Sequence, residues 1–195
     1  MRHLLLATRN SHKTREFAEI LGADFAVRDL SGDPEAPVIE ETGSTFAENA
    51  ILKAVALSKQ FAEVVVADDS GLEVDVLQGA PGVYSARYAG PGATDDENIA
   101  RLLSELRKFA DNRSFTARFR CLLALARRGE VIDTFQGVIE GTIVDPPRGN
   151  TGFGYDPVFQ PADFTQTFAE LPSAEKNRIS HRARAIRSLR GKLLI

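Results

Sequence analysis

The sequence predicts an α/β fold with a mixed sheet, and two observations support this prediction. Helical and strand patterns alternate in the early part of the chain, which is typical of helices that cover a sheet. A long run of alternating residues further on predicts a two-stranded hairpin. The 195 residues, 43% of them hydrophobic, suffice for one globular domain of one or two lobes.

The first elements are a buried strand and a helix joined by a polar turn. HLLLATRN, at residues 3–10, predicts the strand and the turn. SHKTREFAEILG, at 11–22, predicts a helix that has one apolar side, ends at its glycine and is capped by Asn10 or Ser11. FAVRDL, at 25–30, is a candidate for a second strand.

A loop, a helix and another buried strand follow. Residues 31–44 contain glycine, two prolines and four acids, so we predict a loop there. TFAENAILKAVALSKQF, at 45–61, has apolar residues at spacings of three and four, which predicts a helix, and Thr45 with Glu48 matches a capping box. EVVVADD, at 63–69, predicts a buried strand.

The rest of the chain continues this alternation and ends with basic residues. GLEVDVL, at 71–77, alternates apolar and acidic residues as a half-exposed strand does, and 93–109 predict a helix with acids in its first turn. Residues 114–144 predict a hairpin that turns near Arg128 and Gly129. The chain then has a loop rich in glycine and proline at 145–157 and one or two basic helices at 173–191.

Charge and cysteine content exclude several classes of protein. The net charge of −3 does not indicate general nucleic-acid binding. Cys121 is the only cysteine, so neither a disulfide within the chain nor a zinc cluster built from thiolates is possible. The apolar run at residues 4–7 is too short for a signal peptide core or a membrane span. We therefore expect a cytoplasmic protein that binds neither nucleic acid nor membranes.

The turn TRNSHK, from Thr8 to Lys13, is a candidate phosphate site. The backbone N–H groups at a helix start, together with Thr8, Asn10 and Lys13, can hold an anionic phosphate. The spacing of a Walker A loop is absent. The alternative is an ordinary polar turn with a helix cap.

Two acidic pairs are candidates for a magnesium site, because Mg²⁺ prefers carboxylate oxygens. They are Glu40 with Glu41 and Asp68 with Asp69. Since neighbouring residues of a strand point to opposite faces, we expect one member of each pair to face a given site. The alternative is solvated surface acids, which suits the first pair better, because the second pair directly follows a buried strand. Gly71 predicts a tight turn after that strand.

Two further stretches suit a nucleotide. In TGFGYDP, at 151–157, the glycines allow close backbone approach, and a base could stack on Phe153 or Tyr155; the alternative is a glycine-rich turn with its aromatic rings in the core. In the basic stretch, Ser180 can cap a helix that has His181 and Arg182 in its first turn. Cations are disfavoured there, which indicates an anion nearby. The alternative is a solvated basic face.

Five segments closely resemble the inosine triphosphate pyrophosphatase family. They read LLLATRNSHKTREFAEIL, EETGSTFAENAILKA, VVADDSGLEVDVLQGAPGVYSARYAG, GNTGFGYDPVFQP and FAELPSAEKNRISHRARA, and they cover nearly the whole chain in the family's order. The resemblance implies Mg²⁺-dependent hydrolysis of ITP, dITP and XTP to the monophosphate and pyrophosphate. It also implies an elongated α/β fold, a single catalytic domain (1–195) of two lobes with a central cleft, and a homodimer.

The resemblance also implies roles for individual residues. Asp69 matches the residue that binds Mg²⁺ and accepts a proton, and Glu40 matches the metal carboxylate, with Glu41 beside it; which glutamate is the ligand stays open. Arg9 stands where many family members have glycine, and we expect it to add a phosphate contact. The substrate-binding positions are Thr8, Arg9, Asn10, Ser11, His12, Lys13, Ser70, Phe153, Gly154, Tyr155, Asp156, Lys176, His181 and Arg182.

The implied reaction is attack of water on the α-phosphorus, with Asp69 orienting or deprotonating the water and Lys13 stabilising the pyrophosphate that leaves. Arg182 or Lys176 can donate to the 6-keto oxygen of the base, which would reject ATP but not GTP. One rival is a hydrolase of modified pyrimidine triphosphates. The others are a nucleotide-binding module without turnover and a scaffold protein.

Overall fold

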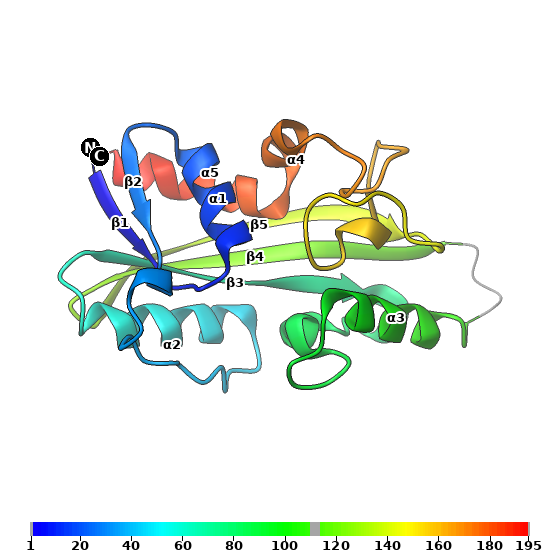
Figure 1. The fold of residues 1–195 in the computed structure, drawn as a ribbon, viewed down its shortest axis with the longest axis horizontal. Coiled ribbons are helices and arrows are strands. Elements are labelled where there is room, and N and C mark those ends of the chain that lie inside the picture. The colour runs from blue at the N-terminus through cyan, green and yellow to red at the C-terminus, as the bar shows by residue number, and fades with distance from the viewer. Residues whose placement is uncertain (1, 110–113, 195) are drawn as a thin grey trace. The chain divides into compact units, whose positions relative to one another are not determined.

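The computed structural model describes residues 2–109 and 114–194 and confirms the predicted mixed α/β fold (Figure 1). Six strands form one sheet in the order β2-β1-β3-β4-β5-β6. β1 pairs in parallel with β2 and β3, whereas β6 pairs antiparallel with β5. The strands are β1 (Arg2–Leu6), β2 (Phe25–Arg28), β3 (Val64–Val74), β4 (Phe115–Arg127), β5 (Glu130–Ile143) and β6 (Phe159–Pro161). The helices are α1 (Ser11–Leu21), α2 (Phe46–Ser58), α3 (Asp95–Leu106), α4 (Ser173–Ile179) and α5 (His181–Leu193).

The chain divides into two compact units. The first unit comprises Met1–Asp69, Cys121–Gly137 and His181–Ile195, and the second comprises Ser70–Arg120 and Val138–Ser180. The three long strands β3, β4 and β5 contribute residues to both units. None of the described helices has the length and apolar character needed to cross a bilayer.

The first unit has a sheet covered by helices on both faces. Residues of β1 alternate: Leu5 packs in the cluster that contains Ala50, Ala54 and Leu57 of α2, and Leu4 and Leu6 pack on the other face. That second face is covered by α1 and α5, and Figure 1 shows α2 on the opposite side of the strands from these two helices. Successive residues of β1 therefore point alternately to two helical layers.

The predicted helix starts of this unit are confirmed. Asn10 is the N-cap of α1, and its side chain accepts hydrogen bonds from two backbone N–H groups. Thr45 and Glu48 form the predicted capping box of α2. The predicted hairpin turn at Arg128 and Gly129 is also present, between β4 and β5. These features depend on local sequence, which is why the pattern predicts them well.

The second unit has its own aromatic core, which packs against α3. Phe119 of β4 lies 4.6 Å, centroid to centroid, from Phe159 of β6, and Phe168 stacks nearby at 5.9 Å from Phe119. Leu102 and Leu106 of α3 belong to the same buried cluster. This core is separate from the two helical layers of the first unit.

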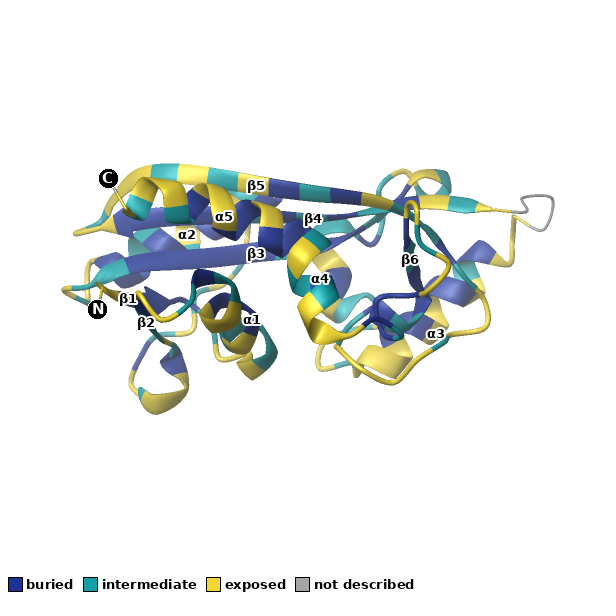
Figure 2. Ribbon diagram, turned by 90° about the horizontal axis from the view of Figure 1, so that it is seen from above, coloured by how far each residue is buried: buried dark blue, intermediate teal, exposed yellow. Residues whose placement is uncertain are grey.

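The prediction of a tight turn at Gly71 is wrong. β3 continues without interruption from Val64 to Val74, and Figure 2 shows it buried along most of its length. The physical reason is that Leu72 and Val74 are both fully buried in the core of the second unit, so extending the strand buries two more apolar side chains. Ser70 and Gly71 are therefore strand residues.

Candidate active site

The polar turn from Thr8 to Lys13 connects β1 to α1, as predicted. Asn10 Oδ1 accepts hydrogen bonds from the N–H groups of His12 and Lys13, at 2.9 and 3.2 Å. Ser11 is exposed at the first residue of the helix, and His12 Nδ1 lies 3.0 Å from an arginine of the next turn. The turn thus presents a helix N-terminus with several polar side chains around it.

Arg9 contacts the segment after β2 in this structure. Its Nη2 donates a hydrogen bond to the carbonyl oxygen of Ala36 at 2.7 Å. A backbone bond from Leu30 N–H to Thr8 O, at 2.9 Å, makes a second link between the same two segments. The polar turn and the acidic loop at 31–44 are therefore tied together, and the phosphate contact expected of Arg9 stays a prediction.

Asp68 and Asp69 point to opposite faces of β3, as strand alternation predicts. Asp68 lies on the face covered by α1 and α5, where Lys13 and Arg182 bind its carboxylate. Asp69 lies on the face of α2, with its Oδ1 3.5 Å from Lys53 Nζ. Two adjacent acids therefore have two separate sets of partners.

Asp68 is the fully buried centre of an ionic network. Its Oδ2 accepts from Arg182 Nε at 2.9 Å and from the Cys121 thiol at 3.3 Å, and its Oδ1 accepts from Lys13 Nζ. Burial alone would raise the pKa of Asp68, but the charges of Arg182 and Lys13 outweigh it and hold that pKa well below its usual range. Burial raises the pKa of the Cys121 thiol, which stays protonated and donates.

Asp69 has the opposite electrostatic environment. Burial raises the pKa of Asp69, and the nearby Glu41 raises it further, while the charges of Lys53 and Lys13 only partly oppose this. Within the described part of the chain, the buried Oδ2 of Asp69 accepts no hydrogen bond of normal geometry. A carboxylate that is poorly solvated and more basic than usual is suited to accept a proton or to bind a cation.

Lys53 is a site residue that the sequence analysis missed. Its Nζ donates to Glu41 Oε1 at 2.6 Å and to the backbone carbonyl of Asp68 at 2.9 Å. Burial lowers the pKa of Lys53, but the charges of Asp69 and Glu41 outweigh it and raise that pKa. The signal that could have identified it is the spacing of four from Asn49, which places two polar residues on the inner side of an apolar helix.

The two glutamates of the acidic loop differ in their surroundings. Glu40 is exposed, whereas Glu41 is half-buried and paired with Lys53. Within the described ranges, no cluster of three or more acidic, histidine or cysteine side chains could hold a metal ion without further ligands. Mg²⁺, however, is commonly held by one or two carboxylates together with substrate phosphates. The buried Oδ2 of Asp69 and the neighbouring Glu41 fit that requirement.

In the second unit, the predicted loop and α4 bring together Phe153, Asp156 and Lys176. Lys176 Nζ donates to Asp156 Oδ2 at 2.6 Å and lies 4.7 Å from the centroid of the Phe153 ring. The same Asp156 oxygen accepts from Phe153 N–H at 2.9 Å. At Gly152, where φ is 80°, a Cβ would lie 2.0 Å from this oxygen, so the position requires glycine, and the close approach of this backbone to a nucleotide stays a prediction.

Tyr155 lies in the core of the second unit. It is 3% exposed, and its hydroxyl donates to the carbonyl oxygen of Ser85 at 2.9 Å. Phe153, by contrast, is half-buried, so it is the ring of this loop that a base could reach. Gly154 N–H donates to Asp95 Oδ2 at 2.6 Å, which anchors the loop to the start of α3. Asp95 is a second supporting residue that sequence analysis missed.

The remaining predicted positions divide between the units. His181 is the first residue of α5 in the first unit, and both His181 and Arg182 are buried. Ser180 is the C-cap of α4, and the cap predicted for it at the start of α5 stays a prediction. Ser70 is half-buried in the part of β3 that belongs to the second unit. The structure thus gathers the polar turn, the acids and Arg182 in the first unit, and Phe153, Asp156 and Lys176 in the second.

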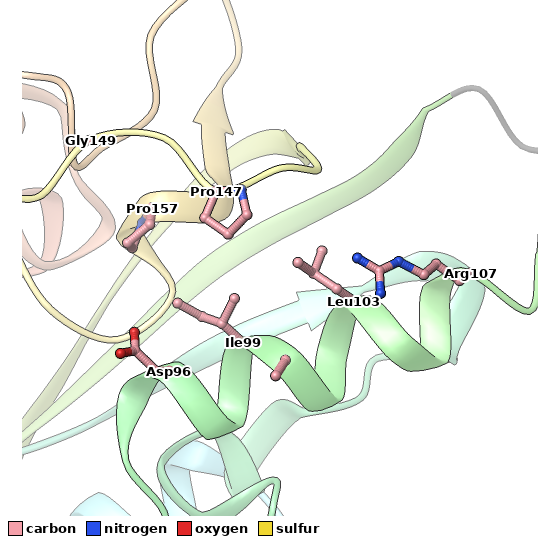
Figure 3. A pocket seen from close by; sticks show the side chains of 8 residues that line it. Asp96, Ile99, Leu103, Arg107, Pro147, Gly149 and Pro157 are labelled. Carbon is pink, nitrogen blue, oxygen red and sulfur yellow. The ribbon is translucent and has the colours of Figure 1, made fainter.

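A hollow of about 410 Å³ in the second unit is separate from these residues. Ile99 and Leu103 of α3 point into it toward Pro147 and Pro157 (Figure 3). Arg107 is the cation among the residues that line it. None of the substrate-binding positions expected from the sequence lines this hollow.

Comparisons with known proteins agree with the fold and with the resemblance. The dITP/XTP pyrophosphatase of Bacillus licheniformis is 50% identical over 190 residues, which are 97% of this chain and 96% of that protein. The enzyme of the same name from Bacillus subtilis is 51% identical, with the same coverage. The HAM1 protein of Coxiella burnetii superposes with a TM-score of 0.88 at 43% identity, over 100% of this chain and 99% of that one.

A family model gives the same assignment. The model of the Ham1 family matches residues 4–192, which is nearly the whole chain. The match includes nearly all of both units and every site residue described above. The chain therefore belongs to the Ham1 family.

Proposed function

We propose that this chain hydrolyses nucleoside triphosphates with deaminated purine bases (ITP, dITP and XTP) to the nucleoside monophosphate and pyrophosphate. The printed names of its Bacillus relatives support the substrate class. The observation that supports the chemistry best is Asp69 on the face of α2, because burial and the nearby Glu41 raise its pKa despite the charge of Lys53. A rigid strand thus holds a basic carboxylate in the same unit as a polar helix N-terminus.

The first unit would bind the triphosphate and perform the hydrolysis. The N-terminus of α1 and Lys13 offer positive partial and full charge to phosphate oxygens. Asp69 accepts a proton from water as the water oxygen forms its bond to the α-phosphorus. The bond from the α-phosphorus to the bridging oxygen breaks, and pyrophosphate leaves with Lys13 as its counter-charge.

Mg²⁺ is part of this proposal. Asp69 and Glu41 would hold it, and Glu40 is the alternative to Glu41. When bound, the ion neutralises charge on the phosphate oxygens. Lys53 donates to Glu41 and lies 3.5 Å from Asp69, so it orients both carboxylates.

The second unit would recognise the base. Lys176 is held by Asp156 and can donate to a 6-keto oxygen, and the half-buried ring of Phe153 offers a stacking surface. Arg182 was the other candidate donor, but its Nε and Nη1 bind Asp68 and Glu16, so we assign the base contact to Lys176. We also propose that the protein is a cytoplasmic homodimer, and this part is based on the family resemblance alone.

A substrate panel tests this function. Pyrophosphate release is measured for ITP, dITP, XTP, ATP, GTP and a modified pyrimidine triphosphate, with Mg²⁺ and with EDTA. We expect kcat/KM to be highest for the deaminated purines and release to stop in EDTA. Equal kcat/KM values for ATP and ITP would contradict the proposed recognition of the base. A kcat/KM that is highest for the modified pyrimidine triphosphate would favour the rival hydrolase. Binding of a triphosphate without release of pyrophosphate would favour a binding module.

A further inference from the structure

Four alternating charges form a chain of three ion pairs in the first unit. Lys13 Nζ binds Asp68 Oδ1, Asp68 Oδ2 binds Arg182 Nε at 2.9 Å, and Arg182 Nη1 binds Glu16 Oε2 at 2.7 Å. Lys13 and Glu16 lie one turn apart on α1, while Asp68 comes from β3 and Arg182 from α5. The chain of ion pairs therefore leaves α1 at one residue and returns to it at another.

Burial is graded along this chain. The side chain of Asp68 is 0% exposed and that of Arg182 is 2% exposed, whereas Glu16 is 11% exposed and Lys13 is 17% exposed. The four formal charges cancel, and each of them is paired with a charge of opposite sign. Lys13, at the most exposed end, is the member that belongs to the phosphate turn.

The geometry of Arg182 makes Glu16 important for Lys13. A guanidinium group is planar and rigid, so its bonds to two carboxylates fix its orientation. Without the charge of Glu16, Arg182 loses one of the two carboxylates that fix its plane. A change in that plane would alter the bond from Arg182 to Asp68, the carboxylate that also binds Lys13.

We propose that Glu16 is a positioning residue for the hydrolysis: it orients Arg182, which orients Asp68, which in turn holds the Lys13 ammonium at the phosphate turn. The inference depends on the role given to Lys13 under the proposed function. It adds a residue that lies away from the phosphate turn, on the next turn of α1. It also explains why two cations occur in the first turns of α1 and α5, where the helix dipole disfavours them, because both bind Asp68.

A double-mutant cycle tests the inference. The kcat/KM for dITP is measured for wild type, Glu16→Gln, Lys13→Ala and the double variant, well below the lowest Tm of the set. We expect Glu16→Gln to lower kcat/KM about tenfold with Lys13 present and less than about twofold in the Lys13→Ala background, as for groups that are coupled. A residue with a merely structural role would lower Tm without this dependence on Lys13.

Two further variants complete the experiment. Glu19→Gln removes the same charge from the exposed part of α1 and should leave kcat/KM unchanged. Glu16→Asp keeps the charge with a shorter reach and should fall between wild type and Glu16→Gln, and it replaces Glu16→Gln in the cycle if that variant does not fold. Equal losses in both Lys13 backgrounds would overturn the inference. A Lys13→Ala variant with wild-type kcat/KM would overturn the role of Lys13, and with it this inference.

Discussion

At the scale of single residues, Asp68 and Asp69 show how position on a strand determines chemistry. They are neighbours, yet folding lowers the pKa of Asp68 and raises the pKa of Asp69. Both are desolvated, and the difference comes from their partners. Asp68 binds two cations directly, whereas Asp69 lies 3.5 Å from one ammonium and close to another carboxylate. Asp68 is therefore suited to hold its two cations in place, and Asp69 is suited to accept a proton.

Asp68 should make stability depend on acid pH. Because folding lowers its pKa, its ionised form contributes stability that is fully present above the ordinary aspartate pKa of about 4 and is lost as pH falls below it. At neutral pH, Asp68→Asn leaves buried cations poorly paired and should cost about 3–5 kcal/mol. When thermal unfolding is followed from pH 2 to 7, the Tm of the variant should fall less at acid pH than the Tm of the wild type. Parallel curves for both proteins would contradict this.

The two glutamates of the acidic loop should differ in their effect on the metal requirement. Glu41 is half-buried and shares Lys53 with Asp69, whereas Glu40 is exposed. We expect Glu41→Gln to raise the Mg²⁺ concentration for half-maximal activity by about tenfold or more, because loss of even an outer-shell partner of a metal ligand costs about 10–100-fold in metal affinity. Glu40→Gln is the matched control and should change it less. The reverse order would make Glu40 the ligand.

At the scale of elements, the sequence predicts what depends on neighbours along the chain. The cap at Asn10, the capping box at Thr45 and the turn at Arg128 all follow from residue types at fixed short spacings. The prediction of a turn at Gly71 is wrong, because glycine also occurs within strands when the residues beside it are buried. Local pattern alone does not show that Leu72 and Val74 enter the core of the second unit.

The loop that holds Lys176 should be sensitive to one methyl group. Gly152→Ala adds a Cβ that would lie 2.0 Å from Asp156 Oδ2, and its φ of 80° disfavours any side chain. We expect kcat/KM for dITP to fall about tenfold or more, mainly through KM, because Asp156 must move away from Lys176. Gly92→Ala is the control: it has a similar φ of 75° but open space around the Cβ. Equal losses in both variants would show that backbone strain, and not the displaced carboxylate, is responsible.

At the scale of the whole molecule, the parts that sequence analysis missed are contacts between distant segments. Arg182 binds Asp68 and Glu16 across 114 and 166 positions, and Lys53 binds Glu41 from a different element. Each of these residues has an ordinary local setting in the sequence: a basic stretch, an apolar helix, an amphipathic helix. The candidate positions were identified through the family resemblance, but their partners required the fold.

The central claim is that Asp69 is the catalytic carboxylate, and the most direct test is to measure kcat for dITP hydrolysis and Tm on the Asp69→Asn variant. Folding raises the pKa of Asp69, so the ionised group is disfavoured in the folded state and a neutral amide should leave Tm at neutral pH equal or higher. We predict that kcat falls by about 10²–10⁴ while the protein stays folded. A folded variant whose kcat stays within a few-fold of wild type would contradict the account.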